Sequence, residues 1–376
     1  MSDSARPIRV MQLLYSLGVG GSEKLALSIA SHVDADRFQF HFCGMDLGGE
    51  LTQALDRQRI PHHVMNRKGL EAGVFGRLHR VIKQNRIQVV HTHHFTQLFY
   101  GGLPARLAGA RIVHTEHEFF SYSQSAFSQT VIRPLSRLCE HVTAVGPEVA
   151  DFFTQRIGLP RELVTVVPNG VDVKAFDHDA AAVRRELGLD ANEIVIGTVG
   201  RLEPEKDQMT LLEMFRQIQP TTAPIRLVIV GTGAMAEDLK ATAARLGIAD
   251  RTLFLGLRHD VPRLLAAMDL FVLTSVREGL PISLVEAMAA RLPVVASNVG
   301  SIRDLVRDGQ TGFVVPAGDV SGFRAAVDRL VGCPDMRRRF GSEGRSTVEG
   351  SFSLSAMIRA YQDMYVSAAQ RSHVRN

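Results

Sequence analysis

The chain has 376 residues, of which 45% are hydrophobic and 22% are charged, a composition typical of a globular protein long enough for two domains. Its formal net charge of +4 is too small to indicate nucleic-acid binding, and its three cysteines, without CxxC spacing, indicate neither a disulfide framework nor a zinc ribbon. No apolar run reaches the roughly 18 residues of a membrane span and the N-terminus lacks a signal peptide's apolar run, so we expect a cytoplasmic protein.

The first 145 residues alternate between short apolar runs and amphipathic stretches. Glu23–His32 and Arg77–Asn85 have the apolar spacing of helices. This alternation predicts a parallel sheet with helices on both faces. The predicted strands are Ile8–Leu14, Phe38–Cys43, Val89–Thr92, Ile112–Thr115 and Val142–Val145, with His62–Met65 as a weaker candidate.

The same alternation restarts after a break that contains a Pro-Asn-Gly turn at 168–170. We therefore predict an α/β protein with two doubly wound, Rossmann-like domains, at 1–180 and 181–352. The remaining segment, 353–376, contains a helical pattern and ends in a polar tail. The strands predicted for the second domain are Ile194–Val199, Arg226–Val230, Thr252–Leu255, Leu270–Thr274 and Pro293–Ser297.

Glycine-rich turns follow the first strand of one predicted domain and the second strand of the other. Gly20 and Gly21 open a helix, where free backbone N–H groups can bind an anion. A dinucleotide fingerprint would have a third glycine in place of Glu23, which disfavours an NAD-dependent dehydrogenase, although Asp46 could serve as its acidic residue. A plain turn is the structural alternative. Gly233 lies in the second turn, which is weak evidence alone.

Two cations follow the first strand of the second domain. Arg201 and Lys206 suit a diphosphate, because a guanidinium can donate to two oxygens at once. Each charge-assisted hydrogen bond of this kind contributes on the order of 1.5–3 kcal/mol. Surface salt bridges to Glu203 and Glu205 are the structural alternative.

Two glutamates, Glu278 and Glu286, flank seven residues that are almost all apolar. The segment between them begins with Gly279-Leu280-Pro281, and Pro281 fits the first turn of a helix because it lacks an N–H. The spacing presents one carboxylate to a sugar and a second to ribose hydroxyls. Two solvated charges are the alternative, which the apolar residues between them disfavour.

Eleven of the fourteen histidines precede residue 145. His91, His93 and His94 end one predicted strand, and His114 and His117 end the next. Adjacent imidazoles could bind zinc, but no cysteine or acidic ligand recurs at a recognised spacing, so we expect no metal. A polar surface for a hydroxyl-rich ligand is favoured instead.

Basic residues dominate the segment from residue 56 to residue 86. An anionic membrane surface attracts such a segment by roughly 1 kcal/mol per basic residue, and an ordinary solvated helix face is the alternative. The eight basic residues are Arg57, Arg59, Arg67, Lys68, Arg77, Arg80, Lys83 and Arg86, against the acids Asp56 and Glu71.

Taken together, these motifs resemble those of the family 4 retaining glycosyltransferases (glycosyl transferases group 1), whose two-domain fold is called GT-B. The resemblance covers nearly the whole chain, and its motifs are highly specific in combination. They are Gly20-Gly21, VPNGVD at 167–172, Gly200-Arg201-Leu202 with Lys206, Glu278 through Glu286, and GQTGFVV at 309–315.

The resemblance implies a role for each matching residue. His117 and Glu278 would contact the transferred sugar, and His117 matches the family's histidine better than His114 does. Within the donor set, Arg201 and Lys206 would hold the diphosphate. The residues expected to bind the donor are Gly20, Gly21, Arg201, Lys206, Gly233, Arg258, Gly279, Leu280, Pro281 and Glu286, of which Glu286 would bind the ribose.

The resemblance also implies the reaction and its partners. A sugar would pass from a nucleoside-diphosphate sugar to a hydroxyl acceptor with retention, without metal or cofactor, in an inter-domain cleft, and the C-terminal helix would return to the first domain. The resemblance places the acceptor in the N-terminal domain. The basic segment at 56–86 and the apolar stretch Ala126–Leu138, with Arg133 and Arg137, indicate a lipid-linked or saccharide acceptor of bacterial polysaccharide or glycolipid assembly, and peripheral binding to the inner membrane face. A nucleotide-sugar 2-epimerase of the same fold and a non-catalytic nucleotide-binding protein stay open as alternatives.

Overall fold

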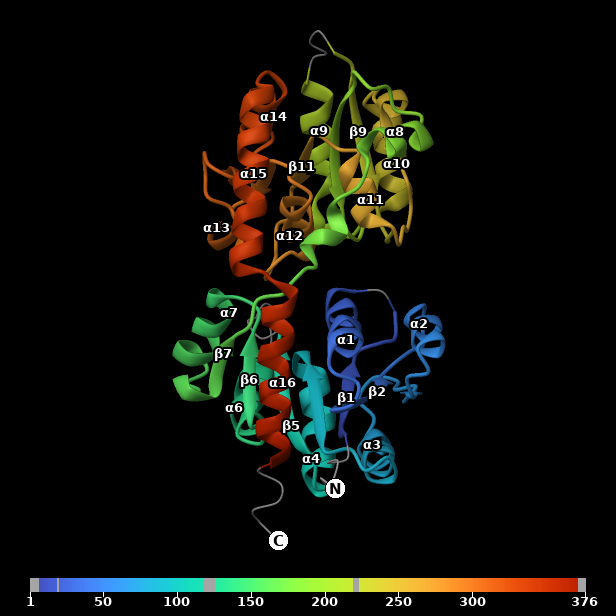
Figure 1. The fold of residues 1–376 in the computed structure, drawn as a ribbon, viewed down its shortest axis with the longest axis vertical. Coiled ribbons are helices and arrows are strands. Elements are labelled where there is room, and N and C mark those ends of the chain that lie inside the picture. The colour runs from blue at the N-terminus through green and yellow to red at the C-terminus, as the bar shows by residue number, and fades with distance from the viewer. Residues whose placement is uncertain (1–6, 19, 118–125, 219–222, 371–376) are drawn as a thin grey trace. The chain divides into compact units, whose positions relative to one another are not determined.

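The structure, a computed structural model, describes residues 7–18, 20–117, 126–218 and 223–370. The chain separates into two compact units, each built on one parallel sheet (Figure 1). The N-terminal unit comprises residues 1–169 and 355–376, and the C-terminal unit comprises residues 170–354. Both sheets are doubly wound, so the predicted fold class is confirmed.

The N-terminal sheet has seven strands in the order β3-β2-β1-β4-β5-β6-β7. The strand order reverses between β1 and β4, and ligands bind beside such a switch point, beyond the carboxyl ends of the strands. The strands are β1 (Ile8–Leu14), β2 (Phe38–Gly44), β3 (His62–Val64), β4 (Val89–His93), β5 (Arg111–Glu116), β6 (His141–Ala144) and β7 (Val164–Val166).

Side chains of β1 alternate between the two faces of this sheet, as the period of a strand requires. Met11 and Leu13 enter the apolar core with α3, α4 and α6, while Gln12 bonds Tyr365 of α16 on the other face. The helices are α1 (Gly21–His32), α2 (Leu51–Arg57), α3 (Gly73–Gln84), α4 (His94–Leu107), α6 (Ala126–Ser136), α7 (Pro147–Asp151) and α16 (Leu354–Gln370), with a π-helical turn at Phe152–Arg156.

The C-terminal helix α16 therefore belongs to the N-terminal unit although it ends the chain (Figure 1). Its buried stripe includes Met357, Ile358, Tyr361, Met364 and Tyr365, which are the apolar positions of its sequence pattern. None of the helices described in the structure is long and apolar enough to cross a membrane.

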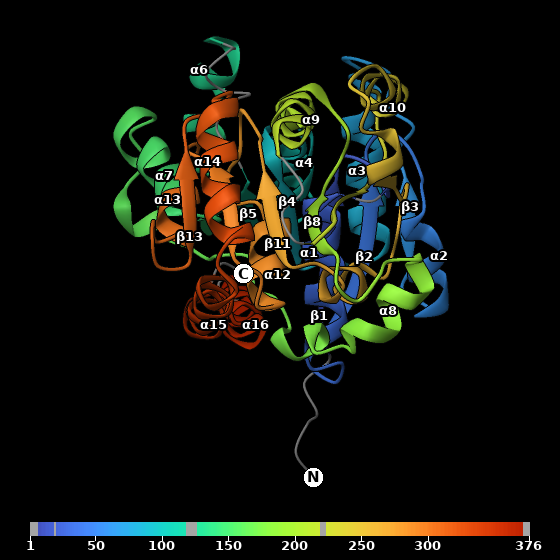
Figure 2. The ribbon, with the colours of Figure 1, turned by 90° about the horizontal axis from the view of Figure 1, so that it is seen from above.

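The C-terminal sheet has six strands in the order β10-β9-β8-β11-β12-β13. Helices α9 and α14 cover one face, and α12 with α15 lies on the other (Figure 2). The strands are β8 (Ile194–Val199), β9 (Ile225–Val230), β10 (Thr252–Phe254), β11 (Leu270–Leu273), β12 (Val294–Ser297) and β13 (Gly312–Val315). The helices are α8 (Ala180–Leu187), α9 (Gln208–Gln217), α10 (Ala236–Arg245), α11 (Val261–Ala266), α12 (Ile282–Ala289), α13 (Ile302–Leu305), α14 (Val320–Val331) and α15 (Pro334–Ser351).

Candidate functional site

Two loops meet at the carboxyl edge of the C-terminal sheet. Thr274, directly after β11, donates its hydroxyl to the carbonyl oxygens of Lys206 (3.2 Å) and Asp207 (2.8 Å) in the loop after β8. The N–H of Val276 donates to the carbonyl of Glu205 at 2.9 Å. The two predicted motifs, separated by about 70 residues in the chain, are therefore held together by backbone contacts.

Lys206 and Glu278 form an ion pair within this junction. The distance from Lys206 Nζ to Glu278 Oε1 is 2.6 Å, and Ser275 Oγ lies 2.6 Å from the same oxygen. The carboxylate is only 8% exposed and the ammonium 18%, so the pair is largely shielded from water. Sequence analysis missed Ser275, whose only signal is its position three residues before Glu278.

Arg201 lies differently from Lys206. Its side chain is 62% exposed, and its Nη2 donates to Glu205 Oε1 at 2.8 Å. The structure therefore brings together Lys206 and Glu278, while Arg201 is an exposed cation bonded to a neighbouring glutamate. Such an exposed pair contributes little to stability, so the guanidinium can turn to a ligand at low cost.

Gly233 has a packing reason to be glycine. A Cβ at this position would lie 2.4 Å from the carbonyl oxygen of Leu202, in the loop that carries Arg201 and Lys206. Leu202 also bonds this turn through its own backbone, to Thr232 and Met235. The glycine thus allows the loops after β8 and β9 to touch.

The segment between Glu278 and Glu286 enters α12, but Pro281 is its N-cap rather than a residue of its first turn, because its ψ of 111° is extended. Among the described residues, no hydrogen-bond acceptor is found for the N–H groups of Gly279 and Leu280. They are donors at the N-terminal end of α12, where a helix favours an anion or an electronegative oxygen. Glu286, inside α12, is half-buried.

Arg258 is bound to acidic side chains. It donates to both oxygens of Asp260 at 2.8 and 2.7 Å, and its Nη2 lies 3.6 Å from Glu186. The hydrogen bond to Asp260 is the main cause that raises the pKa of Arg258. A ligand at this position would therefore meet the neighbouring backbone rather than a guanidinium without a partner.

In the N-terminal unit, Gly20 is the N-cap of α1 and Gly21 its first residue. The carboxylate of Glu23 lies against Gly20, since a Cβ there would be 2.3 Å from Glu23 Oε2. Glu23 is 7% exposed and its Oε2 lies 2.9 Å from Ser22 Oγ. An anion of the protein itself thus already lies at this helix N-terminus, a feature that sequence analysis did not predict.

Asp46, the acid considered for an NAD site, is engaged elsewhere. Arg67 donates to both of its carboxylate oxygens, at 2.7 and 2.8 Å. This bidentate pair further disfavours an NAD-dependent dehydrogenase, because both carboxylate oxygens of Asp46 are already bonded to Arg67 and neither is left for a cofactor hydroxyl.

The histidines separate onto two faces of the N-terminal sheet. His114 is fully buried, with Nδ1 2.9 Å from Thr92 Oγ1 and Nε2 3.5 Å from Glu116 Oε2. His117 follows the end of β5, is half-buried, and places its Nε2 3.0 Å from His93 Nδ1. His117 is therefore the more accessible of the two candidates.

The charge state of this edge follows from its burial. Burial lowers the pKa of His91, His93 and His117 well below the usual value, and neighbouring imidazoles add to the effect, so these rings are neutral. Burial alone would raise the pKa of Glu116, but His114 and His94 beside it lower it to about 2. Among the described residues, no three His, Cys, Asp or Glu side chains are arranged to hold a metal ion.

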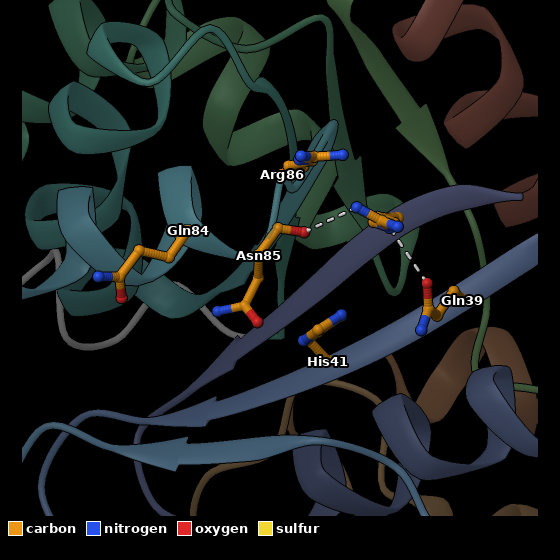
Figure 3. Close-up of a pocket in the computed structure, with 6 residues that line it drawn as sticks. Gln39, His41, Gln84, Asn85 and Arg86 are labelled. Atoms are coloured by element: carbon orange, nitrogen blue, oxygen red, sulfur yellow. Dashed lines mark hydrogen bonds between the residues drawn. The ribbon is translucent and has the colours of Figure 1, made fainter. Parts of the chain in front are cut away.

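A polar hollow of about 370 Å³ lies at the other end of the N-terminal sheet (Figure 3). Arg9 bridges it by donating to Gln39 Oε1 (3.1 Å) and to the carbonyl of Asn85 (3.4 Å). Burial, together with His63 and Arg9, lowers the pKa of His41 in its wall to about 4. The hollow lies near the amino ends of β1 and β2, away from the edge that carries the motifs. The residues that line it are Arg9, Gln39, His41, Gln84, Asn85 and Arg86.

Two families match the chain in succession. Residues 19–175 match Glycosyltransferase Family 4, and residues 179–347 match Glycosyl transferases group 1. HepE of Anabaena, solved in complex with UDP, superposes with a TM-score of 0.84 at 24% identity, over 96% of this chain and all of HepE. HepE in complex with UDP-glucose superposes with a TM-score of 0.83.

Curated relatives extend the likeness. The GDP-mannose-dependent alpha-(1-6)-phosphatidylinositol monomannoside mannosyltransferase of Mycolicibacterium smegmatis is 31% identical over 76% of this chain and 78% of its own. The UDP-Gal:alpha-D-GlcNAc-diphosphoundecaprenol alpha-1,3-galactosyltransferase of Escherichia coli is 29% identical over 77% of this chain and 78% of its own.

Proposed function

The chain belongs to the family 4 glycosyltransferases and is a nucleotide-sugar-dependent glycosyltransferase, and from this premise we propose that it is a retaining, metal-independent enzyme that glycosylates a lipid-linked acceptor. The donor is a nucleoside-diphosphate hexose, with uracil as the first candidate base, because the E. coli relative is named for UDP-Gal and HepE was solved with UDP-glucose.

The Lys206–Glu278 pair carries the proposal. The shielded ammonium of Lys206 can pair with a departing diphosphate. The carboxylate of Glu278, 2.6 Å from that ammonium, can accept hydrogen bonds from the sugar hydroxyls. The amides of Gly279 and Leu280 add donors at the start of α12. Preorganised groups of this kind stabilise developing charge at little reorganisation cost, and each can contribute roughly 10²–10³-fold to turnover.

The proposed reaction is a front-face displacement. The bond from the anomeric carbon to the diphosphate breaks, the acceptor oxygen bonds to the same face of that carbon, and a phosphate oxygen takes the acceptor's proton. Lys206 and Arg201 balance the charge of the leaving group. Glu278 binds hydroxyls instead of acting as the nucleophile that a double displacement requires, since it is already held by Lys206 and Ser275.

An acceptor at a membrane surface is supported by the outer side of α3, α4 and α6. Arg80 and Lys83 are exposed on α3. Leu103 and Leu107 are 50% and 69% exposed on α4, which packs against α3, and Phe127 is 58% exposed on α6, which packs against α4. Basic and apolar side chains together suit an anionic lipid interface. We propose that the protein is cytoplasmic and binds the inner membrane face peripherally.

A donor panel tests the activity. The protein is incubated with UDP-, GDP- and ADP-hexoses and a polyprenyl-diphosphate-linked sugar, with EDTA throughout, and the product's anomeric configuration is read by NMR. We expect one nucleotide class to be consumed, an α-linked product from an α-linked donor, and no effect of EDTA. An inverted linkage, or turnover lost with EDTA, would contradict the proposed reaction.

Flotation with liposomes tests the membrane partner separately. We expect binding to vesicles with anionic lipid that falls several-fold in R80S/K83S, because each basic residue near the surface contributes roughly 1 kcal/mol. R324S/R329S, on α14 of the C-terminal unit, is the matched control. Equal flotation of the two variants would assign membrane binding to another surface.

A further inference from the structure

A hydrogen-bonded chain of buried side chains links the end of β5 to the C-terminal helix. It begins at the carbonyl oxygen of His114, which lies 3.3 Å from Thr143 Oγ1. Thr143 Oγ1 is 2.6 Å from Thr115 Oγ1, which is 2.7 Å from His91 Nε2. His91 Nδ1 lies 2.7 Å from the hydroxyl of Tyr365 on α16.

From Tyr365 the chain turns back toward the ligand edge. The amide Nε2 of Gln12 donates to the Tyr365 hydroxyl oxygen at 3.1 Å, and its Oε1 lies 2.8 Å from His93 Nε2. His93 Nδ1 lies 3.0 Å from His117 Nε2. The side chains of Gln12, His91, His93 and Tyr365 are fully buried, so the hydrogen bonds among them do not exchange readily with water.

The direction of every bond follows from its first member. A carbonyl oxygen only accepts, so Thr143 donates to His114, and its oxygen must accept from Thr115. Thr115 then accepts from His91 Nε2–H, which leaves His91 Nδ1 as an acceptor for Tyr365, since a neutral imidazole has one donor and one acceptor.

The same rule fixes the second half. Having donated to His91, the Tyr365 hydroxyl accepts from the Gln12 amide, so Gln12 turns its Oε1 toward His93. His93 therefore donates from Nε2, its Nδ1 accepts, and His117 must donate from Nε2.

We propose that Tyr365 is a positioning residue that sets the tautomer of His117 through Gln12 and His93, so that His117 presents an unprotonated Nδ1 to its ligand. Resting on the function proposed above, this Nδ1 accepts a hydrogen bond from a hydroxyl of the bound sugar. At this position the site would therefore select a substrate group that donates a hydrogen bond, such as a hydroxyl, over an oxygen that can only accept one.

Tyr361 provides a matched control. It lies one turn before Tyr365 on α16, is also fully buried, and its hydroxyl lies 3.1 Å from Thr115 Oγ1. It is a side branch, because Thr115 already accepts from His91. Loss of the Tyr361 hydroxyl removes one hydrogen bond from the same helix without interrupting the path from His114 to His117.

The test is ¹⁵N NMR of the full-length protein labelled in histidine, since the shifts of the two ring nitrogens distinguish the tautomers. His117 is assigned by loss of its signals in H117Q. We expect wild type and Y361F to show His117 protonated at Nε2, and Y365F to shift it toward the Nδ1–H form. Turnover of the donor should fall roughly tenfold in Y365F, as for loss of one hydrogen bond, and less than twofold in Y361F.

The outcomes separate this inference from the proposed function. A wild-type His117 protonated at Nδ1 overturns it even if neither variant folds, and so does an unchanged His117 signal in Y365F. Equal shifts in both tyrosine variants would mean general loosening of α16 and would also overturn it. If the tautomer changes as expected but no nucleotide sugar is consumed by wild type, the proposed function fails instead.

Discussion

The ion pair between Lys206 and Glu278 stabilises the protein without ligand, and a bound diphosphate would compete with Glu278 for the Lys206 ammonium. In the protein without ligand their charges satisfy each other at 2.6 Å in a largely shielded position. A diphosphate that draws the ammonium away leaves the carboxylate needing another partner, and a sugar hydroxyl can supply it. If the donor binds as proposed, the pair couples binding of its diphosphate to binding of its sugar, and a nucleoside diphosphate without sugar supplies no hydroxyl to Glu278.

Replacement of Lys206 should affect stability and activity together. In K206M the 8%-exposed Glu278 loses its cation and keeps only Ser275, so we expect the free energy of unfolding to fall by roughly 1–3 kcal/mol. Donor turnover should fall by about 10²-fold or more. Urea unfolding and kcat/KM for the nucleotide sugar measure the two effects.

R201M is the matched variant, because Arg201 is exposed and its pair with Glu205 contributes little. We expect its free energy of unfolding to change by less than about 0.5 kcal/mol while its kcat/KM falls at least tenfold. If K206M were as stable as R201M, the proposed need of Glu278 for a cation would be wrong.

The limits of sequence reasoning are clear at these residues. The motif residues Lys206 and Glu278 could be named from type and spacing, because cations and acids after parallel strands indicate a ligand edge. Their direct pairing could not be predicted, because it depends on the hydrogen bond from the Thr274 hydroxyl to the carbonyl of Asp207 and on Ser275. The roles of the predicted site residues stay predictions until the variants are measured.

Loops and strands differ in how well their sequences predict them. The long buried strands were predicted to within a residue or two, because a run of apolar residues such as Ile194–Val199 has few alternatives. Two strands were missed. β7 is a three-residue edge strand with two exposed positions, so it has no buried apolar run. β13 begins at Gly312, and a glycine at that point of the sequence indicates a turn rather than a strand.

The turn after β9 yields a prediction about why its glycine is needed. In G233A the new methyl group would meet the backbone of Leu202, which cannot yield as a flexible side chain can. We expect overpacking to cost about 1–3 kcal/mol of unfolding free energy and to shift the loop that carries Arg201 and Lys206, so donor affinity falls too.

Gly200 is the control in the adjoining loop. A Cβ there would have no heavy atom within 4 Å, and its φ is not positive, so G200A should be as stable as wild type or slightly more stable. Thermal unfolding of both variants, with and without nucleotide sugar, separates packing from ligand contact. A stable G233A with lost donor binding would assign Gly233 to the ligand instead.

At the scale of the whole molecule, the two units should respond differently to acid. Five histidines of the N-terminal unit, His41, His63, His91, His93 and His117, have a pKa lowered chiefly by burial. Between the lowered pKa and the usual value near 6.5, the unfolded chain binds more protons than the folded one. The free energy of unfolding of the N-terminal unit should therefore be highest above about pH 6.5, where both states leave these imidazoles neutral, and should fall as the pH drops below that value.

This asymmetry can be measured without a label, because all five tyrosines lie in the N-terminal unit and the chain has no tryptophan. Tyrosine fluorescence therefore follows that unit alone, while far-UV circular dichroism follows both. As the pH falls below about 6.5, the fully buried His91 and His93 should each cost the N-terminal unit stability, by at most about 1.4 kcal/mol per pH unit. We expect the urea midpoint of the tyrosine signal to fall with pH while a second transition, visible only by circular dichroism, moves less. Midpoints that fall in parallel would show that these buried histidines do not control the acid sensitivity of the N-terminal unit.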